Sequence, residues 1–304
     1  MQTFSKASFA TVLGLLGFGA SAITAHAQVS PPQGYISINR TISGDSPSYY
    51  DGKQTGFYNF DFPFQLSKVG ADMAGTFWAN NFAFKGSDGP GALPANHVGG
   101  VQGGYLGLQV LDATQNVAIF SLWWATASKP GPNATCYDDI EMWYNDDRPF
   151  DPPITDAKVT DQNRKTAGGP FHSCRLDVKL EANKQYKLRL WEVSDGNLAD
   201  DPEWWGAWLI NETDDTEEMI GQIQVPGNWD WLNNGAGGFV EHFGPMPKGC
   251  GSIPANTSIF KVVQADAGTF QSTISTNSYG ACKADIDARS SLSCSGDACT
   301  VKIN

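Results

Sequence analysis

The chain has 304 residues, a formal net charge of −12 and 12% aromatic residues. This acidic balance argues against nucleic-acid backbones and anionic lipid surfaces as partners, because negative charges repel one another. It is compatible with a neutral ligand such as a polysaccharide.

The N-terminus reads as a secretory signal peptide over residues 1–27. Lys6 supplies a positive charge, residues 9–23 are mostly apolar, and residues 25–27 (Ala-His-Ala) form a small-x-small cleavage pattern. The apolar run contains three glycines and is too short to span a membrane comfortably. We therefore expect an exported chain, secreted or periplasmic, without membrane insertion. Cleavage removes Lys6 and leaves 277 residues with a net charge of −13.

Short aromatic segments separated by turn residues follow the signal peptide. Segments of this type are residues 56–62, 76–84, 105–110, 117–124, 186–190, 205–210 and 221–225. Alternating apolar and polar positions with many Gly and Pro residues are typical of strands in a sandwich or barrel. The pattern predicts an all-β fold, an antiparallel β-sandwich of the jelly-roll or lectin-like kind, over residues 28–250. We expect no helix of three turns.

Six cysteines lie after the signal peptide, and four of them fall within residues 250–299. They are Cys136, Cys174, Cys250, Cys282, Cys294 and Cys299. An even number of cysteines in an exported chain predicts disulfides rather than a thiolate metal site. We expect one bridge between Cys136 and Cys174 and two bridges within a small stapled extension, residues 251–304.

Ten tryptophans suggest a ligand with apolar faces, because an indole ring stacks on a sugar ring while its N–H donates a hydrogen bond. The candidates for ligand binding are Trp124, Trp204, Trp229 and Trp231. Trp229 and Trp231 lie in a turn-like segment and are expected to form an exposed platform. In the pairs 123–124 and 204–205, one ring should point into the core and the other outward. The alternative is that these rings only fill the core.

Two carboxylates are candidates for acid–base catalysis. Glu141 follows two aspartates in a predicted strand, and Glu241 precedes His242. Apolar neighbours raise the pKa of a carboxyl group, which is what a general acid requires. We take Glu141, Glu241 and His242 as candidate catalytic residues. The alternative is that these carboxylates are solvated or paired with basic residues.

An acidic segment offers oxygen ligands for a hard cation such as calcium: Asp195, Asn197, Asp200 and Asp201. Its spacing is not that of an EF-hand, and Asp and Asn are also ordinary turn formers. Calcium is the one cofactor that the sequence suggests.

Five segments in order resemble a known family: residues 103–109 (GGYLGLQ), 120–123 (FSLW), 204–208 (WWGAW), 220–223 (IGQI) and 239–244 (FVEHFG). They are similar to the secreted proteins grouped as domain of unknown function thirty-four seventy-two. The resemblance implies a secreted, lectin-like β-sandwich and little about chemistry. It covers roughly residues 55–245. The chain departs from the family at residues 166–172, where an acidic, Gly-rich segment is usual.

These observations favour a secreted carbohydrate-binding protein that recognises an extracellular, neutral glycan. The alternative is a glycoside hydrolase or polysaccharide lyase on the same fold. A cell-surface structural or interaction protein is the third hypothesis.

Overall fold

The computed structural model describes most of the chain beyond the predicted signal peptide. The described residues are 34–43, 48–50, 53–84, 103–123, 125–137, 171–194, 203–225, 229, 231–242, 249–265, 268–269, 271–279 and 282–304. Among them, no helix is both long and apolar enough to cross a membrane.

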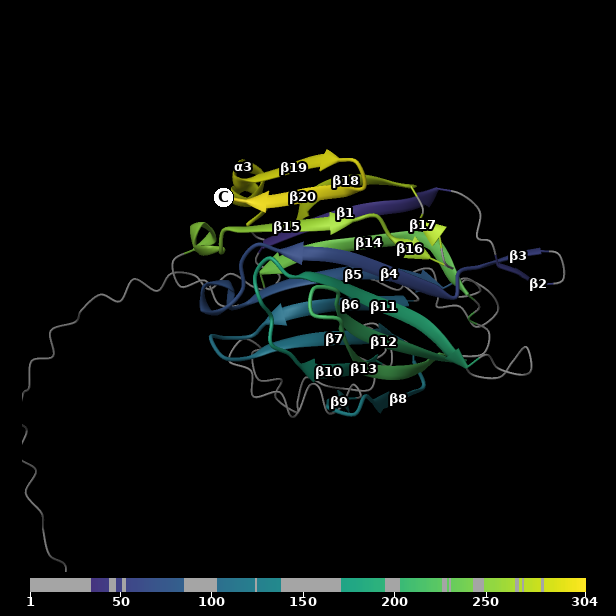
Figure 1. Ribbon diagram of the computed structural model, residues 1–304. Helices are drawn as coiled ribbons and strands as arrows, with labels where there is room; N and C mark the ends of the chain where they lie inside the picture. Colours follow the sequence, from purple (N-terminus) through teal and green to yellow (C-terminus); the bar gives the residue numbers. More distant parts are fainter. Residues whose placement is uncertain are drawn as a thin grey trace, which may run out of the picture.

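Two large antiparallel sheets form the molecule (Figure 1). The eight-stranded sheet has the order β18 (Gln271–Tyr279), β1 (Gly34–Ser43), β14 (Leu232–His242), β5 (Thr76–Phe84), β6 (Gly103–Val110), β7 (Asn116–Trp123), β10 (Phe171–Asp177) and β9 (Ala134–Tyr137). The prediction of an antiparallel β-sandwich is confirmed.

The ten-stranded sheet packs against the first. Its main path is β19 (Ser290–Ser295), β20 (Ala298–Ile303), β15 (Asn256–Lys261), β4 (Asn59–Leu66), β11 (Gln185–Ser194), β12 (Glu203–Asn211), β13 (Thr216–Val225) and β8 (Ala127–Pro130), with β16 (Gln264–Ala265) and β17 (Gly268–Thr269) beside β4. β2 (Ser48–Tyr50) and β3 (Lys53–Gly56) form a separate hairpin.

Alternation along each strand builds the core between the sheets. On β5, Trp78 and Phe82 point inward and are 2% and 1% exposed. On β4 of the other sheet, Phe60, Phe62 and Phe64 point inward and join the same hydrophobic cluster. Because successive side chains of a strand point to opposite faces, the residues between these positions lie on the outer faces of the two sheets.

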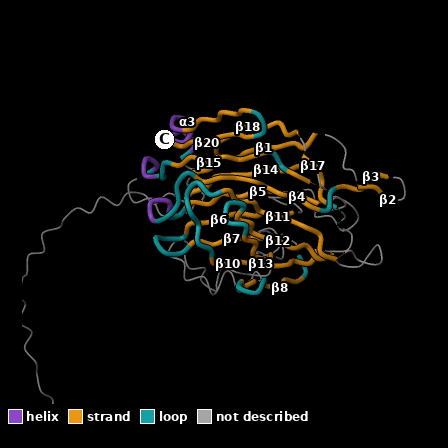
Figure 2. The backbone as a smooth tube through the Cα atoms, viewed as in Figure 1, coloured by secondary structure: helices purple, strands orange, loops and turns teal. Residues whose placement is uncertain are grey.

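Helical structure in the described residues is short. It consists of η1 (Ala71–Met73), η3 (Cys250–Ser252) and α3 (Lys283–Arg289). Figure 2 shows these turns toward one end of the strands. The seven-residue α3 is the longest of them, in line with the expectation of no helix of three turns.

The C-terminal residues are built into both sheets. β18 pairs with β1 in the eight-stranded sheet, and β15 pairs with β4 in the other. Bridges Cys250–Cys282 and Cys294–Cys299 lie in this part of the chain, and Cys136–Cys174 joins β9 to β10. Cys136–Cys174 is the predicted pair, and the other two bridges agree with the expected number of two among the four C-terminal cysteines, whose pairing the sequence left open.

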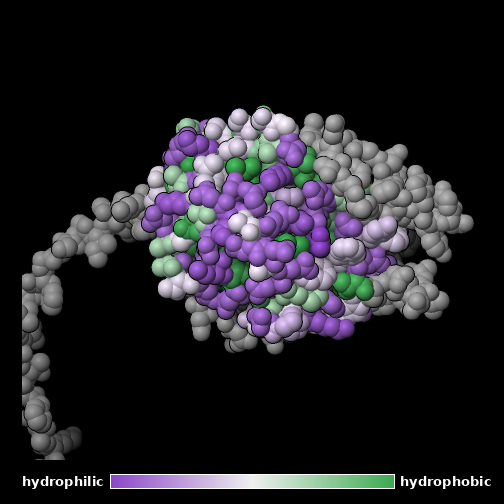
Figure 3. Space-filling model, viewed as in Figure 1, coloured by the Kyte–Doolittle hydropathy of each residue, from purple (hydrophilic) through white to green (hydrophobic). Residues whose placement is uncertain are grey.

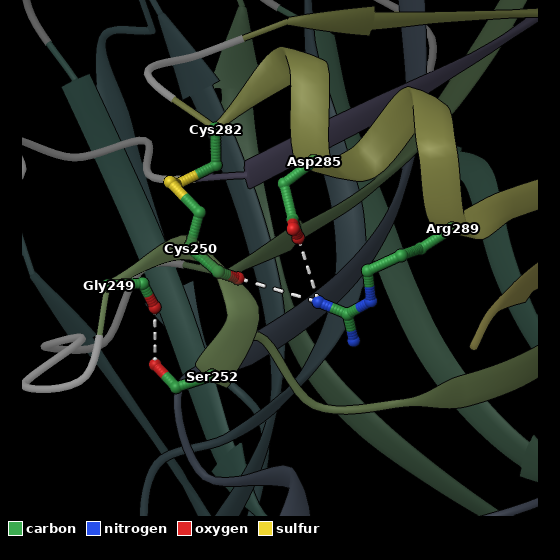
Figure 4. Close-up of a disulfide and its surroundings, with 6 residues drawn as sticks. All are labelled: Gly249, Cys250, Ser252, Cys282, Asp285 and Arg289. Carbon is green, nitrogen blue, oxygen red and sulfur yellow. Dashed lines mark hydrogen bonds and ion pairs between the residues drawn. A yellow bond between two sulfur atoms is a disulfide. The ribbon is translucent and has the colours of Figure 1, made fainter.

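Arg289 at the end of α3 holds the Cys250–Cys282 region together (Figure 4). Its Nη1 atom donates to Asp285 Oδ2 at 2.9 Å and to the Cys250 carbonyl at 3.4 Å, and its Nη2 atom donates to the Ile253 carbonyl at 2.8 Å. The helix is thereby tied to η3, which precedes β15.

Candidate functional site

The candidate site lies on the outer face of the eight-stranded sheet, where Glu241 and Gln109 share a row. Glu241 on β14 is directly opposite Phe77 on β5, and Phe77 is directly opposite Gln109 on β6. Residues in directly opposite positions point to the same face. With neighbouring strands about 4.8 Å apart, the backbones at Glu241 and Gln109 are separated by about 10 Å.

Phe77 lies between these residues, but its ring leans away from their row. A Cβ atom on Gly107 would lie 2.3 Å from Phe77 Cε2, so the ring covers this glycine. Gly107 is two positions from Gln109 on β6 and pairs with Ala79 rather than with Phe77. The Phe77 ring therefore extends toward Gly107, while its Cβ atom stays in the row between Glu241 and Gln109. Glycine at position 107 is required for this arrangement.

Four aromatic rings form a continuous band beside the row. Phe239 lies 5.2 Å from Phe77, Phe77 lies 5.4 Å from Tyr105, and Tyr105 lies 5.3 Å from Trp123, measured between ring centroids. Phe77 and Phe239 are buried, whereas Tyr105 and Trp123 are partly exposed. We call these four residues the aromatic band. It crosses β14, β5, β6 and β7, and its partly exposed rings, those of Tyr105 and Trp123, provide an apolar surface.

Burial raises the pKa of the Glu241 carboxyl group from 4.5 to about 7. The cause is desolvation, which penalises the charged form of a carboxyl group. Within the described part of the chain, no hydrogen bond or ion pair compensates for this penalty. Both protonation states of Glu241 are therefore populated near neutral pH, as a group that both gives and takes a proton requires.

Gln109 is 7% exposed, and its Oε1 atom accepts no hydrogen bond from the described residues. A buried polar atom without a partner costs about 1–3 kcal/mol. Such atoms are rare in folded proteins, and a substrate group that donates a hydrogen bond would supply the missing partner of Oε1. A side-chain amide also provides N–H donors that can stabilise a negatively charged oxygen.

His242 does not act together with Glu241 at this face. It follows Glu241 on β14 and pairs with Thr76, so it points toward the opposite side of the sheet and is 6% exposed. The adjacency of Glu241 and His242 in sequence therefore places their side chains on different faces.

The expectation of an exposed platform at Trp229 is wrong. Trp229 is 4% exposed and belongs to the main core cluster, where its ring centroid lies 5.3 Å from that of Phe84. Trp231 is partly buried and lies 5.4 Å from Tyr58. The polar residues next to Trp229 in the sequence are typical of an exposed turn, but its ring fills the core.

The pair Trp204 and Trp205 follows the predicted alternation. Trp205 is fully buried in the core, whereas Trp204 is partly exposed on the outer face of the ten-stranded sheet. Lys129 Nζ lies 3.8 Å from the centre of the Trp204 ring, a cation–π contact that already occupies one face of the ring.

The other predicted site residues lie outside the described residues. They are Trp124, Glu141, Asp195, Asn197, Asp200 and Asp201. Among the residues that the structure describes, no group of three His, Cys, Asp or Glu side chains is arranged to hold a metal ion.

Gln109 was not among the residues proposed from sequence. One feature of the sequence could have indicated Gln109. It is a polar residue at an outward position of its strand, where Tyr105 and Gly107 are the preceding outward residues. Its partner Glu241 lies 132 positions further along the chain. Only the strand order brings the two together.

No family model matches the sequence, and no curated protein matches it. Among solved structures, the fold is similar to that described as "Crystal structure of Scytalido-glutamic peptidase with a peptide based transition state analog". The identity is 11%, the TM-score is 0.42, and the match covers 89% of this chain and 98% of that chain. A similarity of this degree carries no argument about the activity of this chain.

Proposed function

We propose that this chain is an exported hydrolase in which Glu241 is the acid–base residue and Gln109 orients the substrate. The observation that carries the proposal is the row itself. A carboxyl group with a pKa of about 7 and a buried amide lie in one row on the same face of the sheet, on the two strands that flank β5. The aromatic band beside the row would hold an extended substrate by its apolar groups.

The residue types favour a carbonyl substrate, an amide or an ester. Ionised Glu241 would take a proton from a water molecule as the water attacks the carbonyl carbon, and the Gln109 amide would donate a hydrogen bond to the carbonyl oxygen as it becomes negative. Protonated Glu241 would then return the proton to the leaving group. Both steps use the two protonation states that a pKa of about 7 makes available.

Glycoside hydrolysis has a different requirement, because it commonly uses two carboxyl groups that flank the scissile bond. The polar side chain that shares the row of Glu241, beyond Phe77, is the amide of Gln109. A glycoside hydrolase or polysaccharide lyase at this site would therefore need a second carboxyl group. Glu141 could supply it, but this residue lies outside the described residues.

The test uses the purified full-length secreted chain with fluorogenic peptide and ester libraries between pH 4 and pH 8. We expect turnover that is lost in Glu241→Gln and that falls by about 10²–10³ in Gln109→Leu, the usual effect of removing an oxyanion donor. Ser291→Ala, an exposed position on β19, is the control. No turnover of any substrate by the folded wild type, or unchanged turnover in Glu241→Gln, would overturn the proposal.

Glycan binding is the second candidate function, and exposed aromatic surface favours it. Trp191 on β11 is 42% exposed, which is unusual for so large an apolar side chain. Retention of the wild-type chain on a panel of neutral polysaccharides tests this function. If no polysaccharide retains the folded chain, the interaction-protein hypothesis takes its place.

A further inference from the structure

Exposed large apolar side chains are few in the described residues. They are Tyr58, Trp191 and Val193, at 37%, 42% and 38% exposure. Hydrophilic residues predominate on the face of the molecule shown in Figure 3. Trp191 and Val193 are both outward positions on β11, so two of the three lie side by side on the outer face of the ten-stranded sheet.

Gly206 lies on the sheet beside Trp191 and beneath Val193. Gly206 on β12 is directly opposite Trp191. A Cβ atom on Gly206 would lie 2.4 Å from Trp208 Cη2 and 3.0 Å from Val193 Cγ1. The Trp208 ring and the Val193 side chain therefore close over the glycine backbone. We call Trp191, Val193, Gly206 and Trp208 the Gly206 patch.

The basic residues of β11 next to the Gly206 patch are paired with carboxylates, and the Arg189 guanidinium also lies 5.3 Å from the centre of the Trp191 ring, over one of its faces. Arg189 donates two hydrogen bonds to Asp61, Nε to Oδ1 at 2.8 Å and Nη2 to Oδ2 at 2.9 Å. Lys187 lies 3.4 Å from Asp61 and 3.2 Å from Glu212. These basic residues are neutralised by carboxylates and leave little positive charge for an anionic ligand.

Two uncharged amides lie in the row that contains Trp191, which continues beyond them to Lys129 on β8. Asn59 on β4 is opposite Trp191 on one side, and Gly206 on the other side is followed by Gln222 on β13. Amide groups donate and accept hydrogen bonds and therefore suit hydroxyl groups. An exposed indole with amides in the same row matches a sugar ring, which has apolar faces and a hydroxyl rim.

We propose that the Gly206 patch is a binding site for a neutral polysaccharide, with Trp191 as the stacking residue. The inference rests on glycan binding, the second candidate function, and gives it a location. The Gly206 patch and Glu241 lie on the outer faces of different sheets, so the patch holds a chain of sugars independently of the acid–base pair.

The experiment measures retention of the full secreted chain on cellulose, chitin, β-glucan and xylan, with alginate as the acidic comparison. We expect binding to at least one neutral polymer and about tenfold weaker binding for Trp191→Ala, as for the loss of one well-placed aromatic stacking contact. Trp191→Phe, which keeps a ring, should retain most of the affinity. Tyr58→Ala, which removes a similarly exposed ring outside the Gly206 patch, is the matched control.

Gly206→Ala provides a second variant because its methyl group displaces the Trp208 ring without removing any aromatic residue. We expect weaker retention for this variant as well, with melting temperatures recorded for every variant. Unchanged retention of Trp191→Ala would show that the Gly206 patch is not the glycan-binding site, while glycan binding itself would still stand. Failure of the wild type to bind any polymer would overturn glycan binding itself. Retention on alginate alone would overturn the neutral ligand.

Discussion

Glu241 on β14 and Gln109 on β6 are both paired with Phe77, one on each side of β5. A carboxyl group and an amide are thus held on one rigid sheet at a spacing set by the strands rather than by mobile loops. Sites built on strands keep their geometry more precisely than sites on loops.

The buried carboxyl group predicts a pH dependence of stability. The folded state favours the neutral form of Glu241, so the stability contributed by this group is fully present below pH 4.5 and is lost as the pH rises toward 7. A shift from 4.5 to about 7 corresponds to about 3 kcal/mol. Glu241→Gln should therefore be more stable than the wild type by up to about 3 kcal/mol above pH 7 and similar to it near pH 4.

Urea unfolding of Glu241→Gln and wild type from pH 4 to pH 9 checks this prediction. Stability curves that stay parallel across the whole range would contradict the raised pKa of Glu241. Glu218→Gln, which changes an exposed carboxyl group on β13, is the control and should follow the wild type.

Replacing Gln109 by an apolar residue should lower activity without lowering stability. Because its Oε1 atom has no partner in the described chain, replacing the amide by an apolar side chain of similar shape removes an unsatisfied group. Gln109→Leu should unfold at the same or a higher urea concentration than the wild type, although it lowers hydrolysis. A loss of stability by more than about 1 kcal/mol would indicate that Gln109 is a structural residue.

Because Trp229 is buried, shortening its side chain to that of alanine should strongly destabilise the fold. Trp229→Ala should reduce the free energy of unfolding by about 3–5 kcal/mol, because it leaves a cavity next to Phe84. Trp191→Ala, which removes an exposed ring of the same type, should change it by less than about 1 kcal/mol. Chemical denaturation of both variants measures the contrast, and equal effects would contradict the assigned burial.

Two disulfides of different span form a matched pair for a further prediction. Cys136–Cys174 closes a separation of 38 residues, and Cys294–Cys299 closes one of 5. In the chain-entropy model, removing Cys136–Cys174 lowers the free energy of unfolding by about 4 kcal/mol, and removing Cys294–Cys299 lowers it by about 2 kcal/mol. Replacing each pair by alanines and measuring unfolding under identical conditions should reproduce this order. The reverse order would show that packing around the bridges outweighs their loop length.

Local sequence was sufficient for much of the fold. The predicted strand at residues 76–84 coincides with β5, since alternation and turn residues are encoded within a few positions. The Cys136–Cys174 bridge was also predictable. Both features depend on residues that are close in sequence or limited to a few pairings.

The candidate site was less accessible to sequence reasoning. Glu241 was proposed from its apolar neighbours, but its partner depends on β14 lying beside β5, and no local pattern specifies that order. Trp229 shows a related limit, because its neighbours have the composition of an exposed turn while its ring fills the core. Such features are decided by tertiary packing.

The placement of β1 between β14 and β18 has a consequence for how the chain acquires its structure. Residues 34–43 emerge early from the ribosome, yet both of their partner strands begin only at Leu232 and Gln271. This strand must therefore wait for nearly the whole chain before it can pair, and pairing over such distances is slow. The order of strands thus makes completion of the eight-stranded sheet one of the last steps of folding.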